Sequence, residues 1–480
     1  MLVHRKIFSL AAVRGLRLLA AVALISVTTT AVAADPMPLN PNQQLAHDIY
    51  KELVEINTSQ SVGDTYQAAQ AMAARLKAAG FSDADLQTFQ TAPKRGNLVA
   101  RIHGTGKRKP ILLLAHIDVV EALRADWHSD PYTLVEQDGY YYGRGSGDDK
   151  FMAATFVANM ARWKKEGYRP DRDIILALTT DEEISDRNDY GIKDLLKSHR
   201  ELIDAEFALN EGGGVALQDG KPRWVSVQTS EKLFQSFWLE VTNKGGHSSQ
   251  PSKDNAIYRL ADGLARLEKF DFPVHLNDTT RAYFEKLSTL EQGPEAQDMK
   301  AVTLSPPDAA AATRLSARPA YNAQLRTTCV ATRLEGGHAD NALPQLARAM
   351  VNCRIVPGET PDQVRDVLVK VMADNQIAVK LDRLDTSSEP SPLTRELSAA
   401  IGKLTPKFWP GAPLLPIMSS GASDGRFLRN AGIPTYGHSG LAGDMFDNRA
   451  HGQDERVGVK PFYDGLQYQY ELVKLLAGGK

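Results

Sequence analysis

Two segments of the chain are apolar almost without interruption and then end abruptly in polar side chains: KPILLLAHIDVV (109–120) and DIILALTTDEE (173–183). A strand that is apolar on both faces has to be covered on both faces, which is typical of a largely parallel sheet between two layers of helices. The sequence therefore predicts an α/β fold. Segments with helical periodicity, which are predicted to supply both layers, alternate with the strands: 43–58, 65–81, 150–167 and 191–203.

The hydrophobic pattern changes near Glu231 and returns near residue 389. Between these points it predicts a strand, a helix, a hairpin, a second helix and a last strand: 234–243, 255–270, 326–358, 360–375 and 377–384. This order is typical of a small α+β sandwich, so we predict one domain inserted into another. The outer domain would comprise 34–230 and 389–480, the inserted domain 231–388, and the poorly patterned stretch 271–322 a helical insertion within it.

The first 33 residues have the composition of a secretory signal peptide. A cationic stretch, an apolar stretch (18–27) and small residues ending at Ala33 follow one another, which is the order found in cleaved signals. The apolar run is shorter than the roughly 20 residues that span a bilayer. We therefore predict cleavage after Ala33, export to the periplasm or the medium, and no membrane span afterwards. A retained membrane anchor is the alternative.

The composition of the chain is that of a soluble globular protein, with 42% hydrophobic and 24% charged residues. Its 56 Lys and Arg against 58 Asp and Glu give a formal net charge of −2. Because no basic arm or stripe stands out, nucleic acid is not expected as a partner.

The two cysteines, Cys329 and Cys353, lie in the two strands of the predicted hairpin. A turn centred near Asn341 would place them almost opposite each other. Two thiols alone cannot form a structural zinc site, but in an oxidising compartment such a pair can form a disulfide. We predict a cross-strand Cys329–Cys353 disulfide, with two buried, unreactive thiols as the alternative.

Histidine and acidic residues gather where the predicted strands end. Ligands of open α/β sheets bind beyond the carboxyl ends of the strands, so these side chains are expected to converge. Nitrogen and carboxylate ligands without thiolate suit zinc, and less specifically cobalt or manganese. We therefore predict a site for two divalent ions. The residues concerned are His116, Asp118, Asp148, Asp149, Asp181, Glu182, Glu183, Glu211 and, near the C-terminus, His451.

Two aspartates of this group have specific expected roles. Asp148 follows a glycine-rich run in GRGSGDDK, and its carboxylate has two oxygens with which to bridge two neighbouring ions. Asp118 is two residues after His116, so on a strand both side chains point the same way. Asp118 is therefore expected to hold the far nitrogen of the imidazole.

These motifs resemble those of the dinuclear zinc hydrolases that include aminoacylase, bacterial glutamate carboxypeptidase, succinyl-diaminopimelate desuccinylase and the carnosine dipeptidases. Seven motifs from about Leu45 to the C-terminus carry the resemblance: AHIDVV, GRGSGDDK, TTDEE, LNEGG, KGGHSSQP, GASDGRF and AHGQDERV. The resemblance implies a mixed-sheet catalytic domain with an inserted ferredoxin-like domain that acts as a lid and pairs two subunits. It also implies that one zinc ion is held by His116, Asp148 and Glu211 and the other by Asp148, Glu183 and His451.

The resemblance further implies how the site works. Glu182 would act as general base and then as general acid on a water between the ions, because metal coordination lowers the pKa of water towards about 7. His247 would stabilise the oxyanion, and in many relatives it does so from the other subunit of a homodimer. In relatives the peptide bond after the bridging aspartate is cis, so Asp148–Asp149 is expected to be cis. Asp149 is interpreted as a loop residue only, and Phe151 stands where relatives usually have a small residue.

The substrate is expected to be a small peptide or an N-acyl amino acid with a free carboxylate next to the scissile amide. Arg354, Arg426, Asn341 and the backbone at Gly421 are the candidates for binding it. The leading hypothesis is an exported zinc peptidase of the dipeptidase or carboxypeptidase type. The alternatives are an N-acyl-amino-acid amidohydrolase with the same centre and a non-catalytic metal-binding relative, against which Glu182 argues because a binding protein needs no base.

Overall fold

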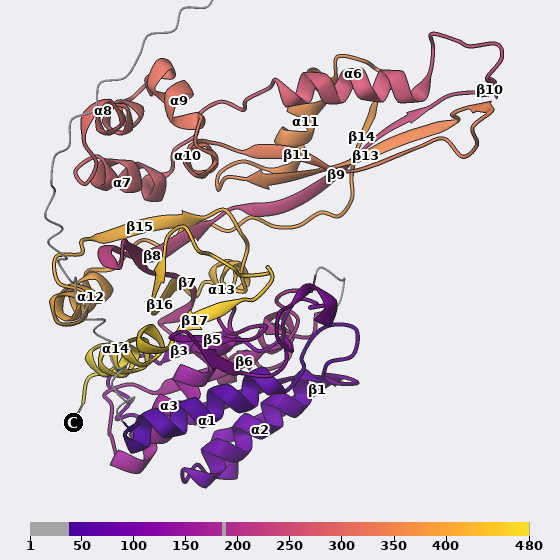
Figure 1. Ribbon diagram of the computed structural model, residues 1–480. Helices are drawn as coiled ribbons and strands as arrows, with labels where there is room; N and C mark the ends of the chain where they lie inside the picture. The colour runs from indigo at the N-terminus through magenta and orange to yellow at the C-terminus, as the bar shows by residue number, and fades with distance from the viewer. Residues whose placement is uncertain (1–37, 185–188, 480) are drawn as a thin grey trace, which may run out of the picture. The chain divides into compact units, whose positions relative to one another are not determined.

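An eight-stranded mixed sheet organises the outer domain (Figure 1). The computed structural model describes residues 38–184 and 189–479, so the predicted signal peptide, 1–33, lies outside the described residues. The sheet has parallel pairs, such as β3 with β6, and antiparallel pairs, such as β2 with β6, which confirms the predicted α/β fold and its mixed sheet. In sheet order the strands are β1 Leu86–Ala92, β2 Arg95–Ile102, β6 Ile174–Thr179, β3 Ile111–His116, β7 Phe207–Gln218, β16 Thr435–Asp444, β8 Lys221–Glu231 and β15 Leu414–Ser419.

Helices cover both faces of this sheet, as the apolar pattern of its strands requires. They are α1 Pro41–Glu55, α2 Thr65–Ala78, α3 Lys150–Glu166, α4 Ile192–Ser198, α5 Arg200–Ile203, α12 Arg395–Phe408, α13 Gly425–Asn430 and α14 Val459–Ala477. In β3, Leu113 packs in the core formed with α1, α2, α3, α12 and α14, whereas its neighbours Leu112 and Leu114 pack in the core formed with α4, α5 and α13. Among the described residues, no helix has the length and apolar character needed to cross a membrane.

Local sequence explains where several helices begin and end. The Asn40 side chain accepts the backbone N–H groups of Asn42 and Gln43 at the start of α1, a typical helix cap. Gly167 ends α3 with a left-handed φ of 67°, a conformation that glycine adopts without steric cost. The predicted helix 191–203 is two short helices, because His199 between them leaves the helical region with φ −141°.

A small three-stranded sheet joins two loops that are far apart in the sequence. Its strands are β4 Val135–Gln137, β5 Tyr140–Tyr142 and β17 Arg456–Gly458. β17 pairs antiparallel with β5, and Arg456 lies opposite Tyr142. The loop that follows β5 and the loop that precedes β17 therefore lie side by side, and these loops carry Asp148 and His451.

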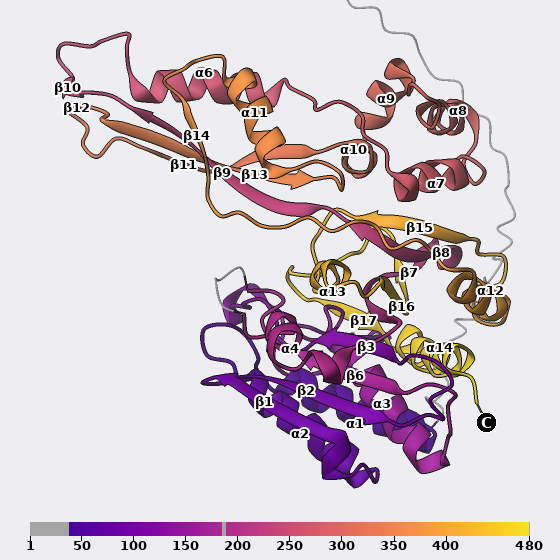
Figure 2. The same ribbon diagram turned by 180° about the vertical axis from the view of Figure 1, so that it is seen from behind.

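The inserted domain is a four-stranded antiparallel sheet with two helices on one face (Figure 2). Its elements are β9 Leu233–Thr242, α6 Ala256–Glu268, β11 Thr328–Gly336, β13 Leu346–Ile355, α11 Pro361–Met372 and β14 Ala378–Leu381. The strand order β11-β13-β9-β14 together with this element order is the ferredoxin-like topology. Buried and half-exposed residues alternate along β9, as its sequence predicts. A short pair, β10 Gly246–His247 and β12 Ala342–Leu343, lies beyond the far end of β9.

The stretch with no clear pattern is helical, as interpreted from the sequence. It forms α7 Asp278–Leu287, α8 Gly293–Val302, α9 Ala309–Ser316 and α10 Pro319–Leu325. These helices share a separate small core that includes Phe284, Met299 and Leu315. Of these helices, α7 lies against β15 of the outer domain, and its Thr279 hydroxyl is 2.8 Å from that of Thr229 in the neighbouring strand β8.

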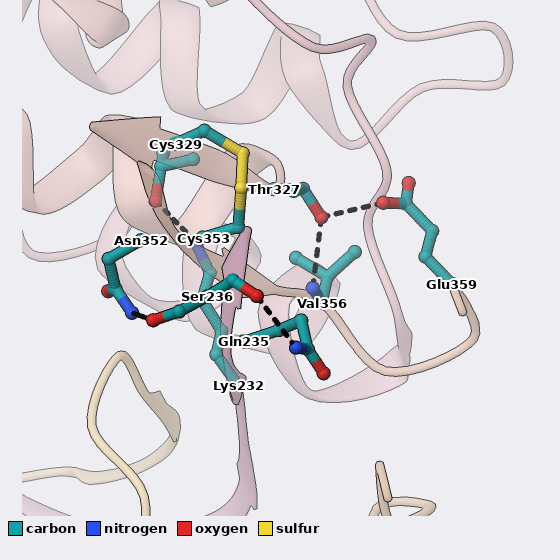
Figure 3. Close-up of a disulfide and its surroundings, with 10 residues drawn as sticks. Lys232, Gln235, Ser236, Thr327, Cys329, Asn352, Cys353, Val356 and Glu359 are labelled. Atoms are coloured by element: carbon teal, nitrogen blue, oxygen red, sulfur yellow. Dashed lines mark hydrogen bonds between the residues drawn. A yellow bond between two sulfur atoms is a disulfide. The ribbon is translucent and has the colours of Figure 1, made fainter. Parts of the chain in front are cut away.

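Cys329 and Cys353 form a disulfide across the hairpin (Figure 3). The two residues are directly opposite each other in the pairing of β11 with β13. The predicted cross-strand bridge is therefore confirmed, and the alternative of two free thiols is wrong.

We expect the double variant Cys329→Ser/Cys353→Ser to lose about 3 kcal/mol of unfolding free energy, because the bridge closes a loop with a sequence separation of 24 and so restricts the unfolded chain. Denaturant unfolding of oxidised parent and variant measures the difference. Metal content should not change, because the bridge lies in the inserted domain whereas the predicted metal ligands lie in the outer domain. An equal stability of the two proteins would contradict this prediction.

Candidate metal centre

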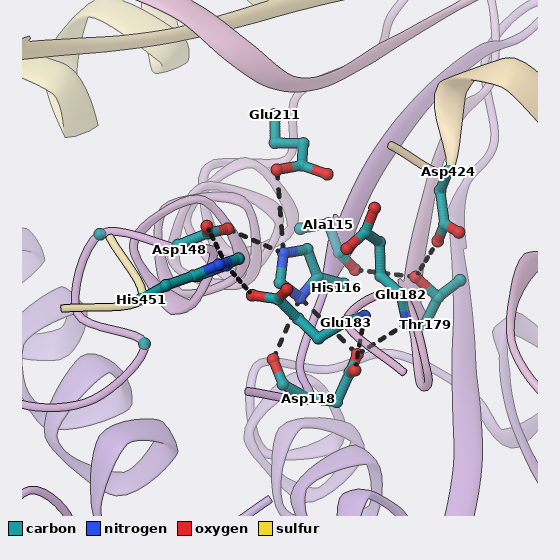
Figure 4. A network of polar contacts seen from close by, with 12 residues as sticks. Ala115, His116, Asp118, Asp148, Thr179, Glu182, Glu183, Glu211, Asp424 and His451 are labelled. Carbon is teal, nitrogen blue, oxygen red and sulfur yellow. Dashed lines mark hydrogen bonds and ion pairs between the residues drawn. The ribbon is translucent and has the colours of Figure 1, made fainter. Parts of the chain in front are cut away.

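The predicted ligands converge at one edge of the eight-stranded sheet. His116 is the last residue of β3, the Glu182–Glu183 pair follows β6, and Glu211 lies within β7. Because β3 pairs in parallel with both β6 and β7, these positions meet at the carboxyl edge of the sheet. The loops before α3 and after β16 add Asp148 and His451 to the same place (Figure 4).

Asp148 lies between the two histidines, with one oxygen towards each. Its Oδ1 is 3.0 Å from His116 Nε2, and its Oδ2 is 3.3 Å from His451 Nε2. Glu211 Oε2 is 3.8 Å from His116 Nε2, while Glu183 Oε1 is 2.9 Å from His451 Nε2. The structure thus brings together both predicted ligand sets, with Asp148 common to the two.

The donor groups fit divalent cations. They are imidazole nitrogens and carboxylate oxygens without a thiolate, and ligand atoms of His116, Asp148 and Glu183 lie within 4.8 Å of one another. Glu211 Oε1 is buried and has no hydrogen-bond partner among the described residues. Burial, then the charge of neighbouring Glu182, raises the pKa of Glu211 well above its usual value. Cations placed here would compensate this concentration of buried negative charge.

Asp118 supports three residues of the site at once. Its backbone carbonyl is 3.1 Å from His116 Nδ1, nearer than its carboxylate, which is 3.6 Å away. The carboxylate accepts the backbone N–H groups of Glu182 (3.2 Å) and Glu183 (3.0 Å). The backbone carbonyl of Asp118, rather than the expected carboxylate, therefore lies nearest to the far nitrogen of the imidazole. The carboxylate instead holds the glutamate pair, which the sequence did not indicate.

The chain's match to a known family agrees with this geometry. Residues 112–475 match the peptidase family M20/M25/M40. This chain belongs to that family. Enzymes of the M20 family are metal-dependent peptidases and amidohydrolases with a dinuclear centre, and the His/Asp/Glu group described above has that character. The M20 chain described here is accordingly a metallohydrolase.

Three similar proteins show how this M20 chain relates to others. It is 29% identical over 382 residues to human N-fatty-acyl-amino acid synthase/hydrolase PM20D1, covering 76% of this chain and 74% of that protein. It is 29% identical over 376 residues to a probable carboxypeptidase S-like 2 of Dictyostelium discoideum, covering 76% and 71%. The crystal structure of the M20 metallo-carboxypeptidase Sso-CP2 from Sulfolobus solfataricus has the same fold, with a TM-score of 0.67, 17% identity and coverage of 91% and 99%.

The backbone at two points of the M20 site is unusual. Asp181, just before Glu182, has φ 63°, and His451 has φ 62°, both in the left-handed region that side chains other than glycine rarely adopt. Such residues are commonly found at functional sites. The Asp148–Asp149 peptide bond is cis, as expected.

Asp149 and Phe151, which follow Asp148, are both buried. Asp149 is not merely a loop residue, because its carboxyl group is buried and its Oδ2 has no hydrogen-bond partner among the described residues. Phe151 is also buried and stands edge-on to Phe462, with ring centres 5.7 Å apart. A Cβ atom at Gly465 of α14 would lie 2.7 Å from the Phe151 ring. The larger residue at 151 is therefore accommodated by a glycine on the facing helix.

A cavity of about 1090 Å³ opens beside the metal ligands, and three predicted substrate-binding residues, Arg354, Gly421 and Arg426, line it. Arg354 lies over the Phe234 ring at 4.6 Å, and Arg426 is 2.8 Å from Asp385. Burial, then the charge of Arg426, lowers the pKa of Arg354 below its usual value. This wall of the cavity is therefore suited to an anion.

The fourth predicted substrate-binding residue, Asn341, and the predicted oxyanion donor, His247, do not line this cavity. Both are exposed and lie beside each other at the β10–β12 pair, where Ser248 donates its backbone N–H to the Asn341 carbonyl. The ten residues of β9 separate this pair from the outer domain, a length of about 30 Å. Within one chain, the structure does not bring His247 to the metal ligands.

Two buried acids of the site were not singled out from the sequence, although both lie in motifs that were. Asp424 of GASDGRF accepts a hydrogen bond from the Thr179 hydroxyl at 2.8 Å, and burial raises its pKa to about 7. Glu455 of AHGQDERV is hydrogen bonded to the backbone of the Asp148 loop. The motifs that contain them were the available signal. Neither acid belongs to a group of described residues that could hold an ion, so only tertiary contacts reveal their roles.

Proposed function

We propose that this M20 chain is a zinc-dependent hydrolase that cleaves an amide bond next to a free carboxylate in short peptides or N-acyl amino acids. The observation that carries the proposal is the cavity itself. It is lined both by Asp148, which faces the two histidines, and by the arginines Arg354 and Arg426. A substrate whose carboxylate contacts the arginines would present the adjacent amide to the metal ligands.

In this proposal His116, Asp148 and Glu211 hold one ion, and Asp148, Glu183 and His451 hold the other. Zinc suits this set of nitrogen and oxygen donors, with cobalt or manganese as alternatives. When bound, the ions would polarise the scissile carbonyl and make water a stronger nucleophile near neutral pH.

Glu182 is the proposed general base and acid. It lines the cavity, is adjacent in sequence to the ligand Glu183, and is fixed through its backbone N–H to Asp118. In the proposed assignment it holds neither ion, so its carboxylate can take a proton from the attacking water. The same carboxyl group then delivers the proton to the nitrogen of the leaving amine.

The acyl side of the substrate is proposed to be apolar. Val215, Ile417 and Leu441 line the same cavity, and they can contact an apolar acyl group. The name of the human relative supports an N-acyl amino acid, whereas the name of the Dictyostelium relative supports a peptide with a free C-terminus. We therefore place N-acyl amino acids first and peptides with an apolar N-terminal residue second.

We expect Arg354→Met to raise KM for an N-acyl amino acid by about 10²-fold, because a charged partner of the substrate carboxylate is removed. The matching carboxamide, which lacks the negative charge, should be a poor substrate of the parent and should not be affected by the substitution. Steady-state kinetics on the acid, the carboxamide and a dipeptide, with metal content measured on the same protein, provides the comparison.

Arg348→Met is the matched control. Arg348 is in the same strand, β13, but its partner is Glu335 and it does not line the cavity. Cleavage of the carboxamide by the parent as fast as of the acid would rule out carboxylate recognition. Absence of hydrolysis of all three compounds by fully metallated parent would contradict the proposed function.

A homodimer paired through the inserted domains is part of the proposal. β11 is an edge strand of its sheet, and its Val330 and Leu334 are 60% and 70% exposed. Pairing of two copies along this edge would cover these side chains. It would also offer His247 and Asn341 of one copy to the cavity of its partner, which a single chain leaves without them.

Export is likewise proposed, with residues 1–33 as the signal and the periplasm or the medium as the destination. The N-terminal sequence pattern supports it, and so does a disulfide, which is usual in oxidising compartments. N-terminal sequencing of mature protein from the periplasmic fraction should begin at Ala34. An intact N-terminus in membrane-bound protein would instead indicate a retained anchor.

A further inference from the structure

Glu455 is a buried carboxylate that holds the loop of Asp148 by its backbone. Its Oε1 accepts the N–H groups of Gly147 (2.7 Å) and Asp148 (3.0 Å), and its Oε2 accepts the N–H group of Gly145 (2.9 Å). The Glu455 side chain is only 2% exposed. A neutral side chain of the same shape cannot accept at all these positions, because only a carboxylate has two acceptor oxygens and no donor.

Arg144 links this carboxylate to the loop of His451. Its Nη1 donates to Glu455 Oε2 at 2.8 Å, and its Nη2 donates to the backbone carbonyl of Gly452 at 2.9 Å. Gly452 directly follows His451. The guanidinium is 3% exposed and lies 5.1 Å from the centre of the Trp127 ring. A single buried ion pair therefore contacts both loops, including the backbone of the proposed ligand Asp148 and of Gly452, which follows the proposed ligand His451.

The two proposed ions differ in how much they would depend on this pair. His116 ends a fully buried strand and is held by Asp118, so its position is supported by the core of the domain. His451 is in an exposed loop, its side chain is 54% exposed, and its φ is 62°. Contacts of the loop are therefore what keeps His451 close to Asp148.

We propose that the Glu455–Arg144 pair is a positioning device that keeps the Asp148 and His451 loops in register. Through them it sets the affinity for the ion held by Asp148, Glu183 and His451. This inference rests on the ligand assignment of the proposed function. Because the hydrogen bonds of the pair to the two loops are all to backbone groups, it acts on metal binding and not on the proton transfer assigned to Glu182.

The test is a zinc titration of metal-free parent and Glu455→Gln, with affinity and number of ions measured by calorimetry. The ion held by His116, Asp148 and Glu211 should bind somewhat more weakly, because it shares Asp148. The ion held by Asp148, Glu183 and His451 should bind about 10–100-fold more weakly, as is usual when groups that orient metal ligands are altered. Titration with Co²⁺ should show an altered absorption spectrum for that ion. Excess zinc should restore kcat, because Glu182 is unchanged, whereas a general loss of structure would not be reversed by metal.

Asp173→Asn is a matched control. Asp173 accepts the Gly104 N–H group and pairs with Arg101, which also donates to the Leu202 carbonyl. Like the Glu455–Arg144 pair, this arrangement is a carboxylate and an arginine that pair with each other and bond to backbone groups. It lies at the start of β6, whereas the metal ligands lie beyond its end. Because β6 has six residues, the distance between them is about 20 Å. The control variant should lose thermal stability without a change in either metal affinity.

Arg144→Lys provides a second variant in case Glu455→Gln does not fold. This variant keeps the positive charge and the three backbone N–H bonds that Glu455 accepts. A lysine cannot bond to both the Glu455 carboxylate and the Gly452 carbonyl as Arg144 does, so the variant should also weaken binding of the ion held with His451 selectively. Unchanged affinity for both ions in folded Glu455→Gln or Arg144→Lys would overturn the inference and leave the proposed centre standing. A parent protein that binds fewer than two ions would overturn the inference together with the ligand assignment.

Discussion

Glu182→Gln is expected to lower kcat by about 10²–10⁴-fold while two ions remain bound per chain, because it removes the proposed general base and acid and no proposed ligand. Glutamine has nearly the shape of glutamate, so the cavity and the backbone bond of residue 182 to Asp118 should be preserved. Measurement of kcat with saturating substrate, alongside metal analysis of the same sample, checks both halves of the prediction.

The neighbouring residue supplies the control. Glu183→Gln alters the same turn but removes a proposed ligand, so it should lose one ion, and Asp148→Ala should weaken both ions because Asp148 faces both histidines. The roles of Glu182 and Glu183 would have to be exchanged if Glu182→Gln lost an ion and Glu183→Gln did not. Near-normal turnover by Glu182→Gln would remove it from the mechanism.

His247→Ala is expected to lower kcat by about 10²–10³-fold with unchanged metal content, as when a donor to an oxyanion is removed. Ser249 donates its backbone N–H to His247 Nδ1 at 3.2 Å, so the neutral ring carries its proton on Nε2. The ring is exposed at the end of the inserted domain, so its Nε2–H group can donate a hydrogen bond to a substrate in another copy of the chain. His338→Ala, in the turn between β11 and β12 and also exposed, should have no effect on kcat.

Mixing His247→Ala with Glu182→Gln tests whether the donor comes from the partner. In a heterodimer with two-fold symmetry of contacts, one of the two sites combines the intact Glu182 of one copy with the intact His247 of the other. After complete subunit exchange, about a quarter of parent activity should therefore return from two inactive proteins. An inactive mixture, with exchange verified by mass spectrometry, would place His247 within its own chain's site or exclude it from the reaction.

Sequence patterns were informative wherever one short segment determines the outcome. An apolar run such as 111–115 must be buried on both faces, so it predicts the layered α/β fold, and the polar residues that follow it must lie at an edge of the sheet. For this reason the sequence predicts that His116 lies close to the polar residues that follow the other parallel strands. The hairpin can also be predicted from one short segment. A turn midway between Cys329 and Cys353 is sufficient to place the two cysteines opposite each other.

Tertiary structure alone decided which surfaces meet. Arg144 and Glu455 are 311 residues apart, and no local pattern indicates that the pairing of β5 with β17 joins them. Asp149 is polar and adjacent to a glycine-rich run, which is typical of an exposed loop, yet the packing of that loop buries it. His247 lies within a motif of the family, but only the length of β9 shows that it is far from the cavity of its own chain. Hydrophobic periodicity reports whether a residue is covered, whereas long-range packing determines what covers it.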